Sequence, residues 1–186
     1  MRVENGRAVT LAALFACVLC WAAPAHAVIF DVEALAHSTN ISGSTITGTP
    51  LGTGIFLSVG NVISVSAAVD DVWSAGSDSP CTRTSNADGL TGVGPYGGCD
   101  YGTLSLGPFG APYGALVGRV GSELYLLGTS FFGPVSSAGE LELFYWDTYT
   151  PDNSGSVAVS VDVVPEPATL LLLGGGLAGL LRRRWR

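Results

Sequence analysis

Three stretches of this sequence alternate apolar and polar residues with a period of two, and that pattern constrains the fold more than any other feature. In residues 156–163, Val fills every second position and Ser, Ala and Asp fill the others. Residues 62–69 alternate in the same way, and in residues 139–145 Leu141 and Leu143 oppose two glutamates. Because successive side chains of a strand point to opposite faces of a sheet, the pattern predicts strands with one buried face.

The segment between the two ends of the chain is predicted to be all-β. Four shorter strand candidates accompany the alternating stretches: residues 29–35, 54–59, 115–120 and 124–127. Gly, Pro, Asn and Ser gather between them, as turns require, and a Gly- and Pro-rich stretch runs over residues 76–114. No amphipathic helix of ten or more residues is found. Seven or eight strands joined by Gly-rich turns favour an antiparallel β-sandwich.

The N-terminus has the order of parts found in a secretory signal peptide. Arg2 and Arg7 precede an apolar stretch over residues 8–23, and Ala-His-Ala at 25–27 fits a cleavage site. We therefore expect residues 1–27 to be removed by signal peptidase, leaving a mature start near Val28.

The C-terminus predicts a membrane-spanning helix. Pro165, Glu166 and Pro167 precede fourteen uncharged residues, 168–181, which are followed by four arginines within residues 182–186. At ~1.5 Å per residue the uncharged run covers about 21 Å of a hydrocarbon core about 30 Å thick, and flanking Arg side chains can extend it. The arginines should stay cytoplasmic, so that everything N-terminal to the helix lies outside.

This tail resembles the PEP-CTERM sorting signal of Gram-negative bacteria, which divides the chain into residues 1–27, 28–163 and 164–186. The resemblance implies export, then processing by an exosortase near Pro165, Glu166 and Pro167. It also implies a first stage anchored in the inner membrane by the helix, then association with the cell surface or with an exopolysaccharide or biofilm matrix. From the sequence alone, the helix is either a temporary anchor or a permanent one.

Charge and cysteine content limit what the exported segment does. Residues 28–165 contain thirteen acidic residues, two Arg and no Lys, a net charge near −11. Nucleic acid and anionic membrane surfaces are therefore poor partners. The two remaining cysteines, Cys81 and Cys99, are expected to form a disulfide in an oxidising compartment, closing a Gly-rich loop and contributing about 3 kcal/mol.

The loop between the last two long strand candidates carries the most suggestive group of side chains. Asp147, Asp152 and Asn153 supply three oxygen-bearing side chains, and the carbonyl of Thr150 lies between them. Ca²⁺ takes six to eight oxygen ligands of these kinds. Asp, Asn, Ser and Gly are also ordinary turn residues, so a turn without a metal explains the same residues.

Most of the exported segment resembles the PA-I type galactophilic lectins of bacteria, which are calcium-dependent β-sandwiches. The similarity spans most of residues 55–163 and is sharpest at Asp-(x)4-Asp-Asn-Ser-Gly, which begins at Asp147. It implies a galactose-binding-like, jelly-roll sandwich with Asp147, Asp152 and Asn153 as side-chain calcium ligands and Thr150 as a backbone ligand.

The same resemblance implies a further carbonyl ligand after Trp73, near Ala75, and contacts from Asp147 and Asp152 to a sugar. In that family the hydroxyls of the sugar complete the calcium shell. Residues 76–114 show no clear counterparts of the His and Gln that contact galactose there, so the glycan is left open.

Four aromatic residues could in addition stack on a sugar, although core packing explains each of them as well: Tyr96, Tyr101, Tyr113 and Trp146.

No catalytic motif is found in the exported segment. It has one histidine, His37, and no G-x-S-x-G or H-E-x-x-H sequence. Asp70 and Asp71 could mimic a glycosidase pair, but adjacent strand residues would point to opposite faces. We therefore predict a non-enzymatic, calcium-dependent carbohydrate-binding protein. A matrix protein with the same fold and no ligand is the alternative, and a glycoside hydrolase is a third.

Overall fold

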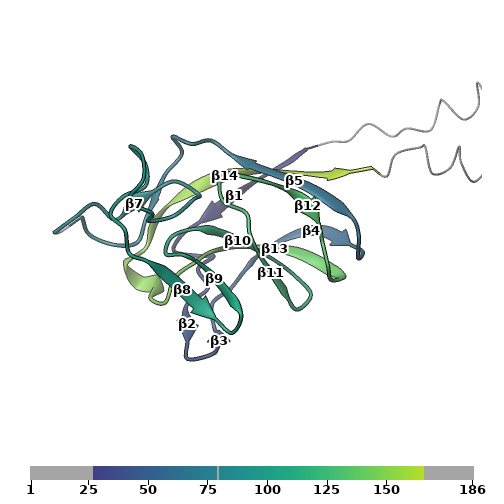
Figure 1. The fold of residues 1–186 in the computed structure, drawn as a ribbon, viewed down its shortest axis with the longest axis horizontal. Coiled ribbons are helices and arrows are strands. Elements are labelled where there is room, and N and C mark those ends of the chain that lie inside the picture. The colour runs from purple at the N-terminus through teal and green to yellow at the C-terminus, as the bar shows by residue number, and fades with distance from the viewer. Residues whose placement is uncertain (1–26, 79, 166–186) are drawn as a thin grey trace, which may run out of the picture. The chain divides into compact units, whose positions relative to one another are not determined.

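The structure, a computed structural model, describes residues 27–78 and 80–165. These residues form fourteen β-strands and one short 3₁₀ helix, and no α-helix occurs among them. The described residues up to Val164 belong to one compact unit. The predicted all-β, antiparallel character of this segment is confirmed (Figure 1).

The first sheet has six strands built around the longest one, β14 (Ser154–Val164). Its order is β12 (Ser130–Pro134), β5 (Val62–Ala67), β14, β6 (Trp73–Ser74) and β7 (Thr84–Ser85), with β1 (Val28–Glu33) also paired to β14. Within this sheet Val161 pairs with Val65 on one side and with Val28 on the other. Every pairing in the sheet is antiparallel.

The second sheet has four strands, in the order β11 (Glu123–Leu126), β10 (Leu116–Val120), β13 (Gly139–Tyr145) and β4 (Leu51–Leu57). As the alternation predicts, Leu141 and Leu143 are fully buried on one face of β13. On its other face, Glu142 lies directly opposite Arg119 of β10 and forms an ion pair with it.

The two sheets enclose one hydrophobic core and form the two layers seen in Figure 1. Buried valines of β5 and β14 contact leucines of β10 and β13 in a single cluster. Trp73 and Tyr145 meet inside it edge to face, with ring centroids 4.7 Å apart. Burying each large aliphatic side chain contributes about 1.5–3 kcal/mol, so this cluster supplies most of the driving force for folding.

Two small hairpins lie outside the main sheets: β2 (Ile41–Ser42) with β3 (Thr45–Ile46), and β8 (Thr103–Leu106) with β9 (Phe109–Pro112). The second hairpin helps to cover a smaller core around Trp146, which is fully buried. The ring of Phe109 meets Trp146 edge to face at 5.1 Å, and Trp146 Nε1 donates to the carbonyl of Leu104.

All seven predicted strands are present, but the sequence missed several others. One is β12, which contains Gly133 and ends in Pro134; it is an edge strand, where a missing N–H is tolerated. The hairpin β8–β9 and strand β7 lie within residues 76–114, which the sequence predicted only as a Gly- and Pro-rich loop.

The strand-based argument about Asp70 and Asp71 is wrong, because β5 ends at Ala67 and both residues lie in the turn that follows. There the Oδ2 atom of Asp71 accepts a hydrogen bond from the N–H of Ala158 at 2.7 Å.

Apart from Ala27, Val164 and Pro165, the two predicted targeting segments lie outside the described residues. The described residues contain no helix that is long and apolar enough to cross a membrane.

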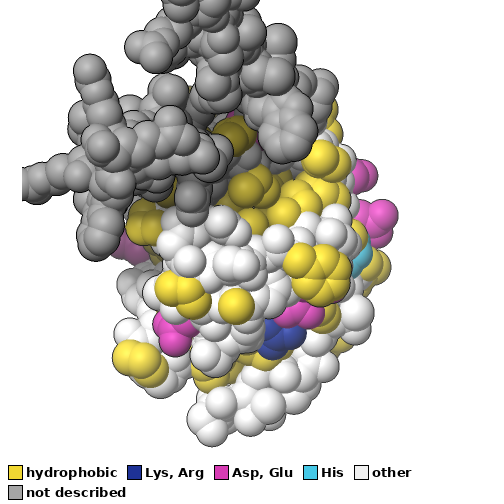
Figure 2. All heavy atoms as spheres, turned by 90° about the vertical axis from the view of Figure 1, so that its right-hand side faces the viewer, with side chains coloured by type: hydrophobic (Ala, Val, Ile, Leu, Met, Phe, Trp, Pro, Cys, Tyr) yellow, Lys and Arg dark blue, Asp and Glu magenta, His cyan; other side chains and the backbone are white. Residues whose placement is uncertain are grey.

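Figure 2 views the molecule from the right-hand side of Figure 1 and shows hydrophobic side chains gathered there, with few basic ones among them. Three large hydrophobic side chains of the domain are each about three-quarters exposed: Ile29, Phe56 and Phe132. Acidic side chains also lie on this face, as expected of a segment with thirteen acidic residues and two arginines.

Candidate calcium and ligand site

Residues 146–153 join β13 of one sheet to β14 of the other. The 3₁₀ turn Thr150–Asp152 lies in this loop, with Pro151 in its first turn. Its carbonyl at Thr150 accepts a hydrogen bond from the N–H of Asn153 at 3.0 Å. The loop is thus held at both ends by long strands, and its polar side chains have a defined position.

A segment far away in the sequence fixes the backbone of Asp147. The hydroxyl of Thr39 donates to the Asp147 carbonyl at 2.7 Å and accepts from the Asp147 N–H at 2.9 Å. The N–H of Ile41 donates to the same carbonyl at 3.0 Å. Sequence analysis missed Thr39, because a single buried threonine carries no signal of its own until the fold places it.

Burial raises the pKa of the Asp147 carboxyl, which is only 6% exposed. The neighbouring Asp152 raises this pKa further. Hydrogen bonds from the Thr148 N–H, the Asn153 side chain and the Tyr149 N–H act in the opposite direction. The Thr148 bond to Oδ1 is 2.6 Å long. The carboxylate is therefore poorly hydrated and lies in a position where a nearby cation would stabilise its charged form.

The side chain of Asn153 is also buried, and its Oδ1 atom has no hydrogen-bond partner. Its Nδ2 atom contacts the hydroxyl of Ser38 at 3.4 Å. The Tyr145 hydroxyl is a second buried polar atom without a partner. The pKa of this hydroxyl is raised by burial and, to a smaller extent, by the charges of Asp147 and Asp152. Buried oxygen atoms without partners are rare in folded proteins, and a role in binding a cation is one explanation.

A pocket of about 310 Å³ opens beside these groups. Nine residues line it: Ala75, Arg83, Leu90, Tyr101, Tyr113, Asp147, Thr148, Tyr149 and Asp152. The structure thus brings together three of the residues expected at the site, Asp147, Asp152 and Ala75. Thr150 and Asn153 do not line the pocket, although both lie in the same loop.

Arg83 is the charged lining residue that was not expected from the sequence. Its guanidinium lies over the ring of Tyr101, 5.1 Å from the centroid, and Tyr101 in turn meets Tyr113 edge to face. The signal that could have found it was its rarity, since the exported segment has two arginines and no lysine.

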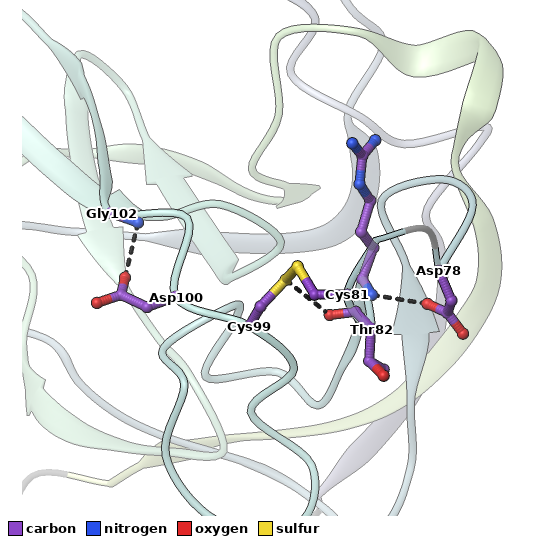
Figure 3. Close-up of a disulfide and its surroundings, with 7 residues drawn as sticks. Asp78, Cys81, Thr82, Cys99, Asp100 and Gly102 are labelled. Carbon is purple, nitrogen blue, oxygen red and sulfur yellow. Dashed lines mark hydrogen bonds between the residues drawn. A yellow bond between two sulfur atoms is a disulfide. The ribbon is translucent and has the colours of Figure 1, made fainter.

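A disulfide between Cys81 and Cys99 holds the segment that carries Arg83 (Figure 3). The N–H of Cys99 donates to the carbonyl of Thr82 at 2.8 Å, and the N–H of Arg83 donates to Oδ1 of Asp78 at 2.6 Å. Cross-linking and hydrogen bonding together limit where the Arg83 side chain can reach.

Gly76 lies beside both the carboxylate of Asp152 and the guanidinium of Arg83. Its φ is +112°, and a Cβ placed on it would lie 2.5 Å from Asp152 Oδ2 and 3.4 Å from Arg83 Nη1. Only glycine leaves room for both groups at this wall of the pocket.

Two of the four aromatic residues considered for sugar stacking line the pocket, Tyr101 and Tyr113. Trp146 is fully buried in the smaller core, which excludes it from contact with a ligand. Tyr96 is not among the lining residues.

The donor set fits a hard cation. Two carboxylates, one amide oxygen and nearby backbone carbonyls are oxygen ligands of the kind that Ca²⁺ takes. Within residues 27–78 and 80–165, no three His, Cys, Asp or Glu side chains lie close enough together to hold a metal. An ion at this loop would therefore depend on amide and carbonyl oxygens as well as on carboxylates.

Comparison with known proteins identifies the C-terminal tail. Residues 163–184 match the model of the PEP-CTERM protein-sorting motif. The chain carries a sorting signal. This confirms the motif expected from the sequence and indicates an exported protein with a C-terminal sorting signal that an exosortase processes.

No curated protein matches the chain. Among solved structures, the chain is similar to one described as the N-terminal domain of EclA, a PllA-like lectin. The two sequences are 25% identical, the match covers 74% of this chain and 98% of that chain, and the TM-score is 0.49.

Proposed function

We propose that the exported sandwich is a non-enzymatic, calcium-dependent carbohydrate-binding domain that acts at the cell surface or in an exopolysaccharide matrix. Asp147, Asp152 and Asn153 would hold the ion with their side chains, and Thr150 with its carbonyl. The observation that carries the proposal is the unpartnered Oδ1 of Asn153, buried beside the carboxylate of Asp147, which lines the pocket. The proposal includes the galactose-binding-like, jelly-roll assignment of the sandwich.

Each residue would have a distinct part in binding. The carboxylates of Asp147 and Asp152 provide negative charge and also accept hydrogen bonds from sugar hydroxyls. Tyr101 and Tyr113 offer ring faces and edges on which the apolar side of a sugar packs. When bound, Ca²⁺ would supply affinity for neighbouring hydroxyl oxygens, which a carboxylate pair alone lacks.

Calcium binding to the full-length chain is the direct test. We expect millimolar Ca²⁺ to raise the melting temperature and to give a binding isotherm by calorimetry, with Mg²⁺ much weaker because it demands a smaller octahedral shell. Asp147→Asn and Asp152→Asn should each abolish the response. Asp31→Asn, at an exposed position on β1, is the matched control and should respond like the wild type.

The proposal would be wrong if Ca²⁺ neither shifts the melting temperature nor gives a binding isotherm. In that case the alternative, a matrix protein with this fold and no ligand, would stand. Arg83 favours that alternative, because its fixed positive charge already lies in the pocket with the two carboxylates. A glycan array without signal in the presence of calcium would support it as well.

A glycoside hydrolase that uses Asp70 and Asp71 has less support. Neither residue lines the pocket, and Asp71 is engaged with the backbone of Ala158. Turnover of a chromogenic glycoside that is lost on substitution of either residue would be needed to revive that hypothesis.

A further inference from the structure

The two arginines of the described residues have different partners. Arg119 donates from Nε to Glu142 at 2.6 Å in an ion pair between adjacent strands. Arg83 forms no ion pair with any described residue, and its Nε is buried without a hydrogen-bond partner. A guanidinium with this lack of partners, on the wall of a pocket, is available to an anionic group of a ligand.

The charge balance of the pocket determines when such an anion can enter. Two carboxylates and one guanidinium line it, which leaves one net negative charge. A bound divalent cation would change this to one net positive charge. Arg83 is the one cationic side chain among the residues that line the pocket, so an anionic group of a ligand would be attracted to it.

We propose that the ligand of this pocket is a carboxylated sugar of the uronic acid class. In this arrangement the sugar hydroxyls face the calcium side, at Asp147 and Asp152, and the sugar carboxylate accepts hydrogen bonds from the guanidinium of Arg83. The planar guanidinium matches a carboxylate with two parallel N–H donors, which an ammonium or an amide does not provide. The ring of Tyr101 lies against the guanidinium, with its centroid 5.1 Å from Cζ.

The position of Arg83 supports this assignment over a role as a built-in substitute for calcium. A guanidinium that replaced the ion would contact the carboxylates directly, and no ion pair joins Arg83 to Asp147 or Asp152 in the structure. Gly76 instead lies beside both the Arg83 guanidinium and the Asp152 carboxylate. The disulfide at Cys81, two residues earlier, anchors the arginine in this separate position.

This inference depends on the calcium site proposed above, so the experiment measures the two properties separately. Calcium affinity of the full-length chain is measured first by calorimetry, without sugar. Binding of methyl glycosides is then measured with saturating Ca²⁺ in pairs that differ only at C6: galacturonide against galactoside, and glucuronide against glucoside. In at least one pair we expect the acid to bind on the order of tenfold more tightly, as one charged hydrogen-bonding contact provides.

Three variants identify the source of that preference. Arg83→Gln should remove the preference for the acid while leaving calcium affinity within about twofold, because the lost contact is to the ligand. Arg83→Lys keeps the charge without the planar fork and should restore part of the preference. Arg119→Gln is the matched control and should keep the full preference. Melting curves verify that each variant is folded.

The outcomes distinguish the two proposals. If the wild type binds no calcium, the proposed function fails. If it binds calcium but prefers the neutral sugar in both pairs, or binds neither acid, the uronic acid inference fails and the metal site stands. Retention of the acid preference by Arg83→Gln would also overturn the inference, as would acid binding of unchanged strength after calcium is removed.

Discussion

Arg83 and Arg119 are alike in one respect and opposite in another. Each guanidinium lies over an aromatic ring at 5.1 Å, Arg83 over Tyr101 and Arg119 over Phe144. Arg119 lies on a strand of a regular sheet, opposite a glutamate in register. Arg83 lies in the disulfide-bonded segment, directly before β7, with two carboxylates in the same pocket and an ion pair with neither.

This difference separates a structural charge from one available for binding. An exposed or half-exposed ion pair such as Arg119 with Glu142 satisfies both groups and leaves nothing for a ligand. In the pocket, Arg83 and the two carboxylates line the same space, yet no ion pair joins them. Four variants test how far this contrast holds.

Loss of the disulfide should have the largest effect. The double variant Cys81→Ser, Cys99→Ser is expected to lower the free energy of unfolding by about 3 kcal/mol, because the unfolded chain regains the entropy of a loop of this size. Urea denaturation measures this, with the wild type in reducing agent as a second route to the same state. If reduction changes neither stability nor ligand preference, the segment around Arg83 is held by its hydrogen bonds alone.

Substitution of Gly76 should have the second-largest effect on stability. Gly76→Ala forces a side chain into a left-handed conformation and against Asp152 Oδ2, which should cost about 1–3 kcal/mol and weaken calcium binding. Gly43→Ala is the control, since Gly43 also has a positive φ, +61°, but open space around it. Equal losses of calcium affinity in the two variants would contradict a specific role for Gly76.

Asp147→Asn should change the stability of the metal-free protein less than the variants above do. It should raise the stability, where they lower it. Because the pKa of Asp147 is raised by burial, the folded state holds its proton more tightly than the unfolded state does. Its contribution to stability is therefore lost as the pH rises from the ordinary Asp pKa of 3.8 through the raised value.

The neutral variant lacks this loss, so its advantage over the wild type should grow over the same pH range. Thermal melts in a chelator from pH 4 to pH 8 measure the difference, with Asp31→Asn as the control. A difference that does not change with pH would contradict the pKa argument. With calcium present the order should reverse, because only the wild type binds the ion.

The ion pair on the second sheet should matter least. A double-mutant cycle with Arg119→Gln and Glu142→Gln is expected to give a coupling energy below about 1 kcal/mol, since both side chains are partly solvated. Calcium affinity should not change in any member of the cycle. A change in calcium affinity would mean that the ion pair influences the pocket. Arg119 would then not be a purely structural residue.

The strands were predictable where burial leaves a period-two pattern, as in Leu141 and Leu143 of β13. They were not predictable where an edge position tolerates Gly133 and Pro134, or where residues 103–112 form a hairpin that covers Trp146. A period-two pattern identifies only strands that have one buried face. The missed segments lack that pattern, because contacts with distant parts of the chain stabilise them.

The residues of the candidate site also fall into a group that could be predicted from the sequence and a group that could not. Asp147 and Asp152 are close in sequence, so one loop motif was enough to suggest that they act together. Thr39 and Arg83 reach the same place from segments about 110 and 60 residues earlier, and no short pattern relates them to that loop. The lining of a pocket by several loops depends on topology, which appears only when the sheets are assembled.

Strand β14 connects the loop of the candidate site to the sorting motif. It begins at Ser154, next to Asn153, and ends at Val164, inside the matched sorting motif. Ten intervals of ~3.3 Å between its eleven residues place its two ends about 33 Å apart. The candidate loop and the start of the sorting motif therefore adjoin opposite ends of a single strand.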